Sequence, residues 1–283
     1  MAPLIVFTDL DGTLLDPVTY SFDAAREALD LLRRRDIPLV LVSSKTRAEI
    51  EPLQSRLQNR DPFIVENGGG LFVPEGYFGF PLEGALPRGP YQVVEWGAPY
   101  PLLRQVLAEI RQVGGDGLRG FGDMTVEEVA KRTGLSLPEA ARAMQREYDE
   151  PFVIEGSDRP LKEIQRLAES RGLRCTSGGR FHHLLGPSDK GRACRYLTEC
   201  YRRHYAGEAE PLTTIGLGDS LNDLPMLAAM DRPVLVQKPD GSYDPAIQLP
   251  SLTRAAGIGP GGWNRAVLDL LRKSASRLSR GEG

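Results

Sequence analysis

The sequence has few cysteines and histidines for its length. It contains three of each among 283 residues, and Cys175, Cys194 and Cys200 follow no Cys-x-x-Cys spacing. An odd and scattered set of cysteines argues against a disulfide framework and against a structural zinc site. We therefore expect these cysteines to be small buried side chains in a fold stabilised by its apolar core.

Long apolar runs and a strong excess of one charge are also missing. No run approaches the ~18 residues that a membrane span needs, and the first residues lack the basic and apolar segments of a signal peptide. The 35 basic and 38 acidic side chains leave a net charge of −3, so a general affinity for nucleic acid or acidic membranes is not expected. These absences predict a cytoplasmic protein without nucleic-acid or membrane partners. Oligomeric state has no clear signal in the sequence.

The composition that is present is typical of a globular protein, with 41% hydrophobic and 26% charged residues. It excludes collagen-like, disordered and disulfide-scaffold classes. The length predicts two domains, or one core that carries an insertion. With 31 glycines and 22 prolines, the chain is expected to turn often.

Strands and helices alternate in the first third of the sequence and again near its end. Short apolar runs at residues 4–7, 38–42, 63–65, 212–217 and 234–236 predict buried strands, with amphipathic helices between several of them. Such alternation is typical of a parallel α/β sheet. We expect a Rossmann-like, doubly wound core.

The pattern changes in the middle of the chain. Residues 74–101 are rich in Gly, Pro and aromatics, which is hairpin or linker composition. Beyond them come helical segments, one of them capped by Thr125, and short strands. We interpret residues 80–186 as an inserted α+β domain, so that residues 1–79 and 187–283 form the core.

Polar side chains gather where the core strands are expected to end. Open α/β sheets bind ligands at the carboxyl ends of their strands. Asp9 and Asp11 share one face of an extended chain because they are two residues apart. Taken singly, Asp11 could belong to an ordinary turn, Ser43 could be a helix cap, and Lys190 could be solvated. Their joint occurrence favours one site. The polar residues at these ends are Asp9, Asp11, Ser43, Ser44, Lys45, Lys190, Asp219, Asn222 and Asp223.

This set of residue types suits phosphoryl chemistry. Clustered carboxylates without His or Cys ligands favour a hard cation such as Mg²⁺. A cation and a lysine neutralise phosphoryl oxygens, and a serine hydroxyl can donate a hydrogen bond to them. One Asp can attack phosphorus to form an aspartyl-phosphate, while a second protonates the leaving oxygen and then deprotonates water.

In order along the chain, Asp9-Leu-Asp11-Gly-Thr13, Ser43, Lys190 and Gly218-Asp219-Ser-Leu-Asn222-Asp223 resemble the four motifs of the haloacid dehalogenase-like hydrolase superfamily. The resemblance implies that Asp9 is nucleophile and Mg²⁺ ligand, and that Asp11 is the acid/base with its backbone carbonyl on the metal. It makes Ser43 and Lys190 the phosphoryl holders and Asp219 a third ligand. Asn222 and Asp223 would orient these ligands. An Asp at the second position of the first motif favours phosphatases or mutases over dehalogenases.

The insertion resembles the α+β cap, of the C2B type, that marks the Cof-type branch of this superfamily. At a finer level, five stretches resemble the mannosyl-3-phosphoglycerate phosphatases: residues 42–46, 66–70, 120–125, 146–152 and 178–182. That family hydrolyses 2-O-mannosyl-3-phosphoglycerate to mannosylglycerate and phosphate, in the synthesis of a compatible solute. The resemblance implies a small phosphorylated glycosylglycerate as substrate, selected by the cap.

Such a substrate carries a carboxylate, a phosphate and a sugar, and the cap segments offer partners for each. Arg180 could pair with the carboxylate in a fork, and Lys45 could reach the same end. Asn67 could bond to hydroxyl groups. His182 could do the same, although His183 alternates with it and only one of them can face the site. The predicted substrate-binding residues are Ser44, Lys45, Asn67, Gly68, Arg180 and His182.

Other functions stay open from the sequence. One is another capped sugar-phosphate phosphatase, of the glucosyl-3-phosphoglycerate, sucrose-phosphate or trehalose-phosphate type, and a phosphomannomutase is a weaker alternative. A regulatory protein that kept only the fold would be expected to have a damaged site, whereas Asp9 is present. We also expect the cap to close over the site, with hinges near residues 79–90 and 186–187.

Overall fold

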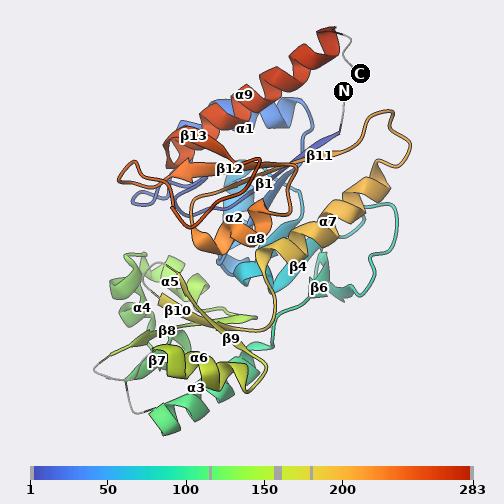
Figure 1. The fold of residues 1–283 in the computed structure, drawn as a ribbon. Helices are drawn as coiled ribbons and strands as arrows, with labels where there is room; N and C mark the ends of the chain where they lie inside the picture. The colour runs from blue at the N-terminus through green and yellow to red at the C-terminus, as the bar shows by residue number, and fades with distance from the viewer. Residues whose placement is uncertain (1–2, 115–116, 156–160, 179–180, 281–283) are drawn as a thin grey trace.

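The computed structural model describes residues 3–114, 117–155, 161–178 and 181–280, and Figure 1 shows two parts. The larger part contains a nine-stranded sheet of order β13-β12-β11-β1-β2-β3-β4-β6-β5. Its parallel strands are β1 (Leu4–Thr8), β2 (Leu39–Val42), β3 (Phe63–Val65), β11 (Thr213–Gly218), β12 (Arg232–Gln237) and β13 (Thr253–Ile258).

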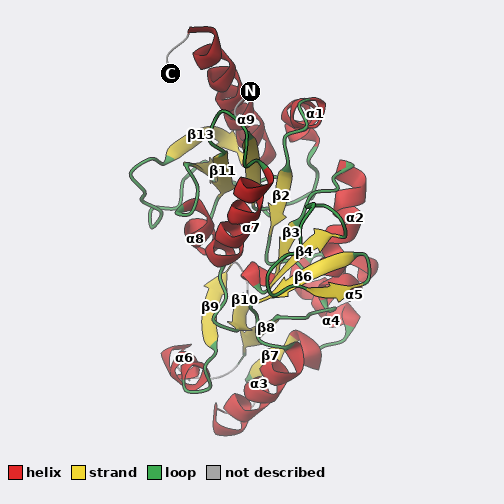
Figure 2. Cartoon of the chain, turned by 90° about the vertical axis from the view of Figure 1, so that its right-hand side faces the viewer, coloured by secondary structure: helices red, strands yellow, loops and turns green. Residues whose placement is uncertain are grey.

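Helices cover both faces of this sheet. Side chains of α1 (Arg26–Arg34), α2 (Arg47–Leu57) and α9 (Gly259–Arg280) join one apolar cluster, while those of α7 (Lys190–His204) and α8 (Leu224–Leu227) join another on the opposite face. Figure 2 shows the sheet between these two layers. All five residues of β1 are buried, as expected for a parallel strand covered on both sides. The predicted doubly wound α/β core is confirmed.

The predicted start of the inserted domain, at residue 80, is wrong. The strands β4 (Gly70–Pro74), β6 (Tyr91–Glu95) and β5 (Leu86–Arg88) extend the core sheet in antiparallel pairs, with Gly70 opposite Glu95 and Pro74 opposite Tyr91. The hairpin therefore belongs to the core, and so does the expected hinge at residues 79–90.

The two connections to the insert lie side by side just beyond this hairpin. A Cβ atom on Gly186 would lie 2.5 Å from the backbone nitrogen of Ala98, so the two segments pack with no room for a side chain. The insert thus runs from about Ala98 to Leu185. The expected hinge at 186–187 coincides with the second connection, while cap movement itself stays a prediction.

The insert is an α+β domain, as expected. Its antiparallel sheet has the order β7-β8-β10-β9, and α3 and α6 supply most of the apolar cluster beside it. Thr125 forms the predicted capping box with Glu128 at the start of α4. The elements are β7 (Leu118–Gly120), β8 (Asp149–Ile154), β9 (Arg174–Gly178), β10 (Phe181–Leu185), α3 (Tyr100–Gly114), α4 (Val126–Thr133), α5 (Leu137–Ala143) and α6 (Leu161–Glu169). Short 3-10 helices cover Asp23–Ala25, Glu66–Gly68, Phe121–Asp123 and Leu221–Asp223.

Two expectations from composition can be compared with this fold. Cys175, Cys194 and Cys200 are all buried and free. Within the described ranges, none of the helices combines the length and the apolar character that crossing a bilayer requires.

Candidate active site

A buried lysine between two carboxylates forms the floor of the site. The Nζ atom of Lys190 lies 2.7 Å from Oδ1 of Asp9 and 2.6 Å from Oδ1 of Asp223. Asp9 follows β1, Lys190 begins α7, and Asp223 lies in the turn after β11, so three elements meet here. Burial works to lower the pKa of Lys190, but the two carboxylates outweigh it and hold the group in its charged form.

Three carboxylates share this buried space. Ligand atoms of Asp9, Asp219 and Asp223 lie within 4.8 Å of one another. Burial and the neighbouring Asp223 raise the pKa of Asp219 to about 6, and the same two causes raise the pKa of Asp9 well above its ordinary value. Anionic groups brought this close repel one another unless a cation joins them.

The cluster fits a divalent cation on its donor chemistry. Its ligands are carboxylate oxygens, which suit a hard ion such as Mg²⁺. Gly12 sits against the cluster at a φ of +80°, and a Cβ atom there would lie 2.9 Å from Oδ2 of Asp219. The hydroxyl of Thr13 donates a hydrogen bond to Oδ1 of Asp219 at 3.3 Å and fixes the position of that carboxylate. The residues Asp9, Asp219 and Asp223 are thus the candidate metal-binding set.

Asp11 has one charged partner, Lys45. Its Oδ2 atom lies 2.9 Å from Nζ of Lys45, and its Oδ1 atom is buried without a partner among the described residues. Lys45 also lies 3.8 Å from Glu49 and over the ring of Tyr20. Burial works to lower the pKa of Lys45, but Asp11 and Glu49 outweigh it. Lys45 therefore contacts Asp11 rather than standing free for a substrate carboxylate.

The serine loop after β2 is packed against the same site. Ser43 is buried, and its Oγ accepts a hydrogen bond from the backbone N–H of Lys45 at 3.2 Å. The carbonyl of Ser44 accepts from Nη1 of Arg146 in the insert at 2.8 Å. Gly68, at a φ of +90°, presses on the start of α7, where an added Cβ atom would lie 2.2 Å from the carbonyl oxygen of Asp189. This glycine sets the distance between the turn after β3 and the start of α7.

The roles expected for Asn222 and Asp223 separate in the structure. Asp223 is fully buried and accepts the backbone N–H groups of Asp219 and Ser220, each at 3.1 Å. Asn222 is exposed and its side chain bonds to the hydroxyl of Ser220. Only Asp223 reaches the carboxylate cluster.

Asn67 reaches into the insert, where it meets an Asp and a His. Its Nδ2 donates to Oδ2 of Asp149 at 3.2 Å, and the same carboxylate lies 2.8 Å from Nδ1 of His183. His182 lies on the other face of β10, where it bonds to Ser177. We infer that His183, rather than the expected His182, is the histidine that faces the site. Arg180 lies outside the described residues.

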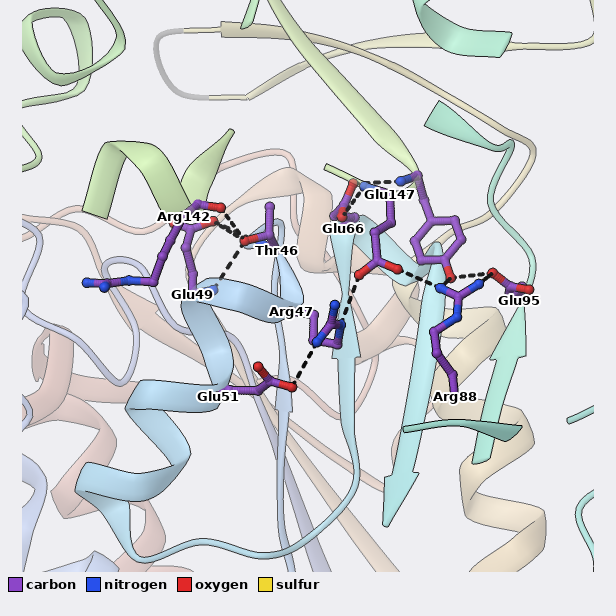
Figure 3. A network of polar contacts seen from close by, with 10 residues as sticks. Thr46, Arg47, Glu49, Glu51, Glu66, Arg88, Glu95, Arg142 and Glu147 are labelled. Carbon is purple, nitrogen blue, oxygen red and sulfur yellow. Dashed lines mark hydrogen bonds and ion pairs between the residues drawn. The ribbon is translucent and has the colours of Figure 1, made fainter. Parts of the chain in front are cut away.

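A second buried carboxylate, Glu66, ties the insert to the core. Its two oxygens accept the backbone N–H groups of Glu147, Tyr148 and Asp149 at 2.9, 2.8 and 2.7 Å. Figure 3 shows Glu66 below this segment. These three hydrogen bonds hold the segment that carries Asp149 against the turn that carries Glu66.

A network of ion pairs extends the contact between insert and core toward the protein surface. Glu147 accepts from Nε of Arg47 at 3.1 Å and pairs with Arg88, which in turn lies 2.9 Å from Glu95 (Figure 3). The Oγ1 of Thr46 donates to the carbonyl of Arg142 at 2.9 Å. Through Arg47 and Arg88, Glu147 joins the insert to the core.

Several residues at this junction have contacts that the sequence does not predict. Glu66, Arg146, Asp149 and His183 all lie in or beside the stretches that carry the family resemblance, yet only their pairing in space shows what they contact. The alternation of His182 and His183 along their strand is the one sequence feature that indicates which side chains meet here.

Comparisons with known proteins agree with this geometry. The profile of a family described as haloacid dehalogenase-like hydrolase matches residues 6–74. The fold resembles a solved structure from Thermoplasma acidophilum, with a TM-score of 0.68, 19% identity and coverage of 96% of this chain and 99% of that one. It also resembles the sucrose-phosphatase of Synechocystis, with a TM-score of 0.58, 19% identity and coverage of 95% and 98%. At these identities the likeness defines the fold: a haloacid dehalogenase-like core with an inserted cap.

Relatives with higher sequence identity define the class of phosphatase more closely. The glucosyl-3-phosphoglycerate/mannosyl-3-phosphoglycerate phosphatase of Methanococcoides burtonii is 50% identical over 95% of this chain and 98% of its own length. The protein of the same name from Persephonella marina is 40% identical over 95% and 98%. The mannosyl-3-phosphoglycerate phosphatase of Pyrococcus horikoshii is 36% identical over 82% and 90%. The chain therefore belongs to this family of haloacid dehalogenase-like phosphatases and is a phosphoric monoester hydrolase.

Proposed function

We propose that the protein hydrolyses the phosphate ester of a 2-O-glycosyl-3-phosphoglycerate, with the 2-O-α-mannosyl compound as leading substrate and the glucosyl compound as alternative. The products are the glycosylglycerate and inorganic phosphate. The observation that carries the proposal is the buried Asp9, held 2.7 Å from Lys190 and within a cluster of three carboxylates. The names of the Methanococcoides and Pyrococcus relatives support the substrate class.

In the first step a carboxylate oxygen of Asp9 attacks phosphorus, and the bond between phosphorus and the ester oxygen breaks. Asp11 gives its proton to that oxygen, so the glycosylglycerate leaves with a neutral hydroxyl group in place of an alkoxide. Lys190 works to lower the pKa of Asp9 against burial and Asp223, which favours the ionised, nucleophilic form, and it neutralises charge on the transferring group. The product of this step is an aspartyl-phosphate on Asp9.

In the second step the proton flow reverses. Asp11, now ionised, takes a proton from a water molecule that attacks the phosphorus of the aspartyl-phosphate. The bond to Asp9 breaks and inorganic phosphate is released. Nζ of Lys45 lies 2.9 Å from Oδ2 of Asp11 and holds the acid/base carboxyl group in position during both steps.

Mg²⁺ would be held by Asp9 and Asp219, with Asp223 beside them and the backbone carbonyl of Asp11 as an expected further ligand. When bound, it would neutralise phosphoryl oxygens as charge develops on them. The chain contributes buried carboxylates, the contact between Thr13 and Asp219, and the close approach that Gly12 permits. Ser43 and Ser44, at the start of the loop after β2, are proposed to donate to the phosphoryl group.

A panel of phosphate esters tests the proposal. We expect the largest kcat/KM, measured as phosphate release with Mg²⁺, for the two glycosyl-3-phosphoglycerates. Sucrose-6-phosphate, trehalose-6-phosphate and mannose phosphates serve as competitors. Preferred hydrolysis of one of these competitors would overturn the proposed substrate class while leaving the phosphatase chemistry intact.

A further inference from the structure

A buried polar atom of Asn67, beside the loops of the candidate site, lacks a partner among the described residues. Asp149 can only accept hydrogen bonds when ionised, so its contact with Asn67 must be made by the Nδ2 amide group of Asn67. The carbonyl oxygen Oδ1 of Asn67 then points elsewhere, and within the described residues it is buried and unpaired. A buried acceptor in this state costs free energy unless a ligand donates to it.

The neighbouring histidine is held in one tautomer. Nδ1 of His183 lies 2.8 and 3.1 Å from the two oxygens of Asp149, which itself has no exposed surface. Because the carboxylate accepts, Nδ1 must carry a proton, and Nε2 of the neutral ring is left as an acceptor. In the described part of the chain, no hydrogen bond to Nε2 is seen. Asp149 is in turn fixed by Glu66, which accepts its backbone N–H at 2.7 Å.

The two acceptors lie between the phosphoryl-binding loops and the cap. The backbone N–H of Asn67 donates to the carbonyl of Ser43 at 3.0 Å, and the adjacent Gly68 packs on the start of α7 beside Lys190. His183 comes from β10 of the insert and meets the same carboxylate of Asp149 that Asn67 contacts. Both acceptors therefore belong to the junction where the cap meets the loops of the candidate site.

We propose that Asn67 Oδ1 and His183 Nε2 form a hydroxyl-binding subsite that recognises the hexose of the substrate, with Asp149 as the residue that positions both. This rests on the proposed function. A 2-O-glycosyl-3-phosphoglycerate has no free hydroxyl on its glycerate, since its three carbons carry the carboxylate, the glycosidic oxygen and the phosphate. The two hydrogen-bond acceptors therefore recognise hydroxyl groups of the hexose, and this recognition distinguishes one sugar from another.

The test compares His183→Ala with His182→Ala on esters with and without the hexose. We expect His183→Ala to lower kcat/KM for 2-O-mannosyl-3-phosphoglycerate about 10- to 100-fold, mainly through KM, because a bond made equally in ground and transition states is lost. Its activity on 3-phosphoglycerate and p-nitrophenyl phosphate is expected to stay at the wild-type level. His182→Ala, on the opposite face of the same strand, is expected to match the wild type on all three esters.

Conservative variants separate positioning from general damage. The amide of His183→Gln can still donate a hydrogen bond to Asp149 and accept one from a sugar hydroxyl. This variant is therefore expected to recover part of the kcat/KM that His183→Ala loses. Asp149→Asn, whose amide can donate to His183, is expected to resemble His183→Ala in its effect on KM for the mannosyl ester. An equal loss on all esters, or no loss on the mannosyl ester, would overturn the subsite. A wild-type protein inactive on both glycosyl esters would instead refute the proposed function, before any variant is compared.

Discussion

At the scale of single residues, the proposed mechanism assigns both proton transfers to Asp11. Replacing Asp11 by Asn keeps the shape of the side chain but removes the group that moves the proton in both steps. We expect kcat to fall about 10²- to 10⁴-fold, the usual contribution of general acid–base catalysis. Steady-state phosphate release measures this. Asp30→Asn, at a surface ion pair with Arg33, is the matched control. Near-normal turnover of Asp11→Asn would remove Asp11 from the mechanism.

From its contact with Asp11, we infer that Lys45 acts on this residue rather than on the substrate. In Lys45→Met the Oδ2 atom of Asp11 loses its cationic partner, so we expect kcat to fall roughly tenfold, as for one lost active-site hydrogen bond. KM is expected to change little. Lys238→Met removes a lysine that pairs with Asp244 away from the site and is the control. A raised KM with unchanged kcat would show that Lys45 binds substrate instead.

At the scale of elements, the cap depends on an ion cluster around Asp123. This residue pairs with Arg104 and Arg111 and accepts the N–H of Gly120 at 2.9 Å. Burial works to raise the pKa of Asp123, but these partners outweigh it and lower the pKa to about 2. The stabilisation is therefore present above the ordinary value near 4 and is lost as the pH falls through 2.

Replacing Asp123 by Asn tests this cluster. At pH 7 we expect the free energy of unfolding to drop by about 1 kcal/mol, a modest figure because solvent screens a partly exposed cluster. The difference between variant and wild type is expected to shrink as the pH falls from 4 toward 2. Urea unfolding at several pH values measures it. A difference that grows at low pH would contradict the assignment.

The same scale shows which parts of the fold can be predicted from sequence. Apolar runs flanked by polar turns locate β1, β2 and β11, because strands buried on both faces must be apolar throughout. Edge strands lack that signal. The residues of β5 are all exposed, and β13 buries only Ala255, so nothing in their composition distinguishes them from loops. That is why residues 80–95 were assigned to the cap.

The site divides in the same way. Asp9, Lys190 and Asp223 could be brought together by topology alone, because strand ends converge at one edge of the sheet. Their contacts at 2.7 and 2.6 Å follow that expectation. The choice of His183 over His182 depends on which face of β10 meets the core, a property of tertiary packing. The partnership of Asn67 with Asp149 crosses from core to cap and has no local signature.

At the scale of the whole molecule, a divalent cation is expected to support both activity and stability. Lys190 pairs with Asp9 and Asp223 but offsets only part of the repulsion among the three carboxylates of the site. We expect EDTA to abolish turnover and Mg²⁺ to restore it. Mg²⁺ is also expected to raise the melting temperature of the wild type, since it binds only the folded state. In Asp219→Asn the rise is expected to be smaller. Full activity after exhaustive chelation would contradict this account.

The central claim is that Asp9, in a capped haloacid dehalogenase-like core, removes phosphate from a glycosyl-3-phosphoglycerate. It is tested most directly by phosphate release from 2-O-mannosyl-3-phosphoglycerate, measured side by side for the wild type and Asp9→Asn. The prediction is rapid Mg²⁺-dependent release by the wild type and none by a variant that remains folded by circular dichroism. A variant that still turns over, or a wild type that leaves this ester uncleaved while hydrolysing an unrelated sugar phosphate, would contradict it.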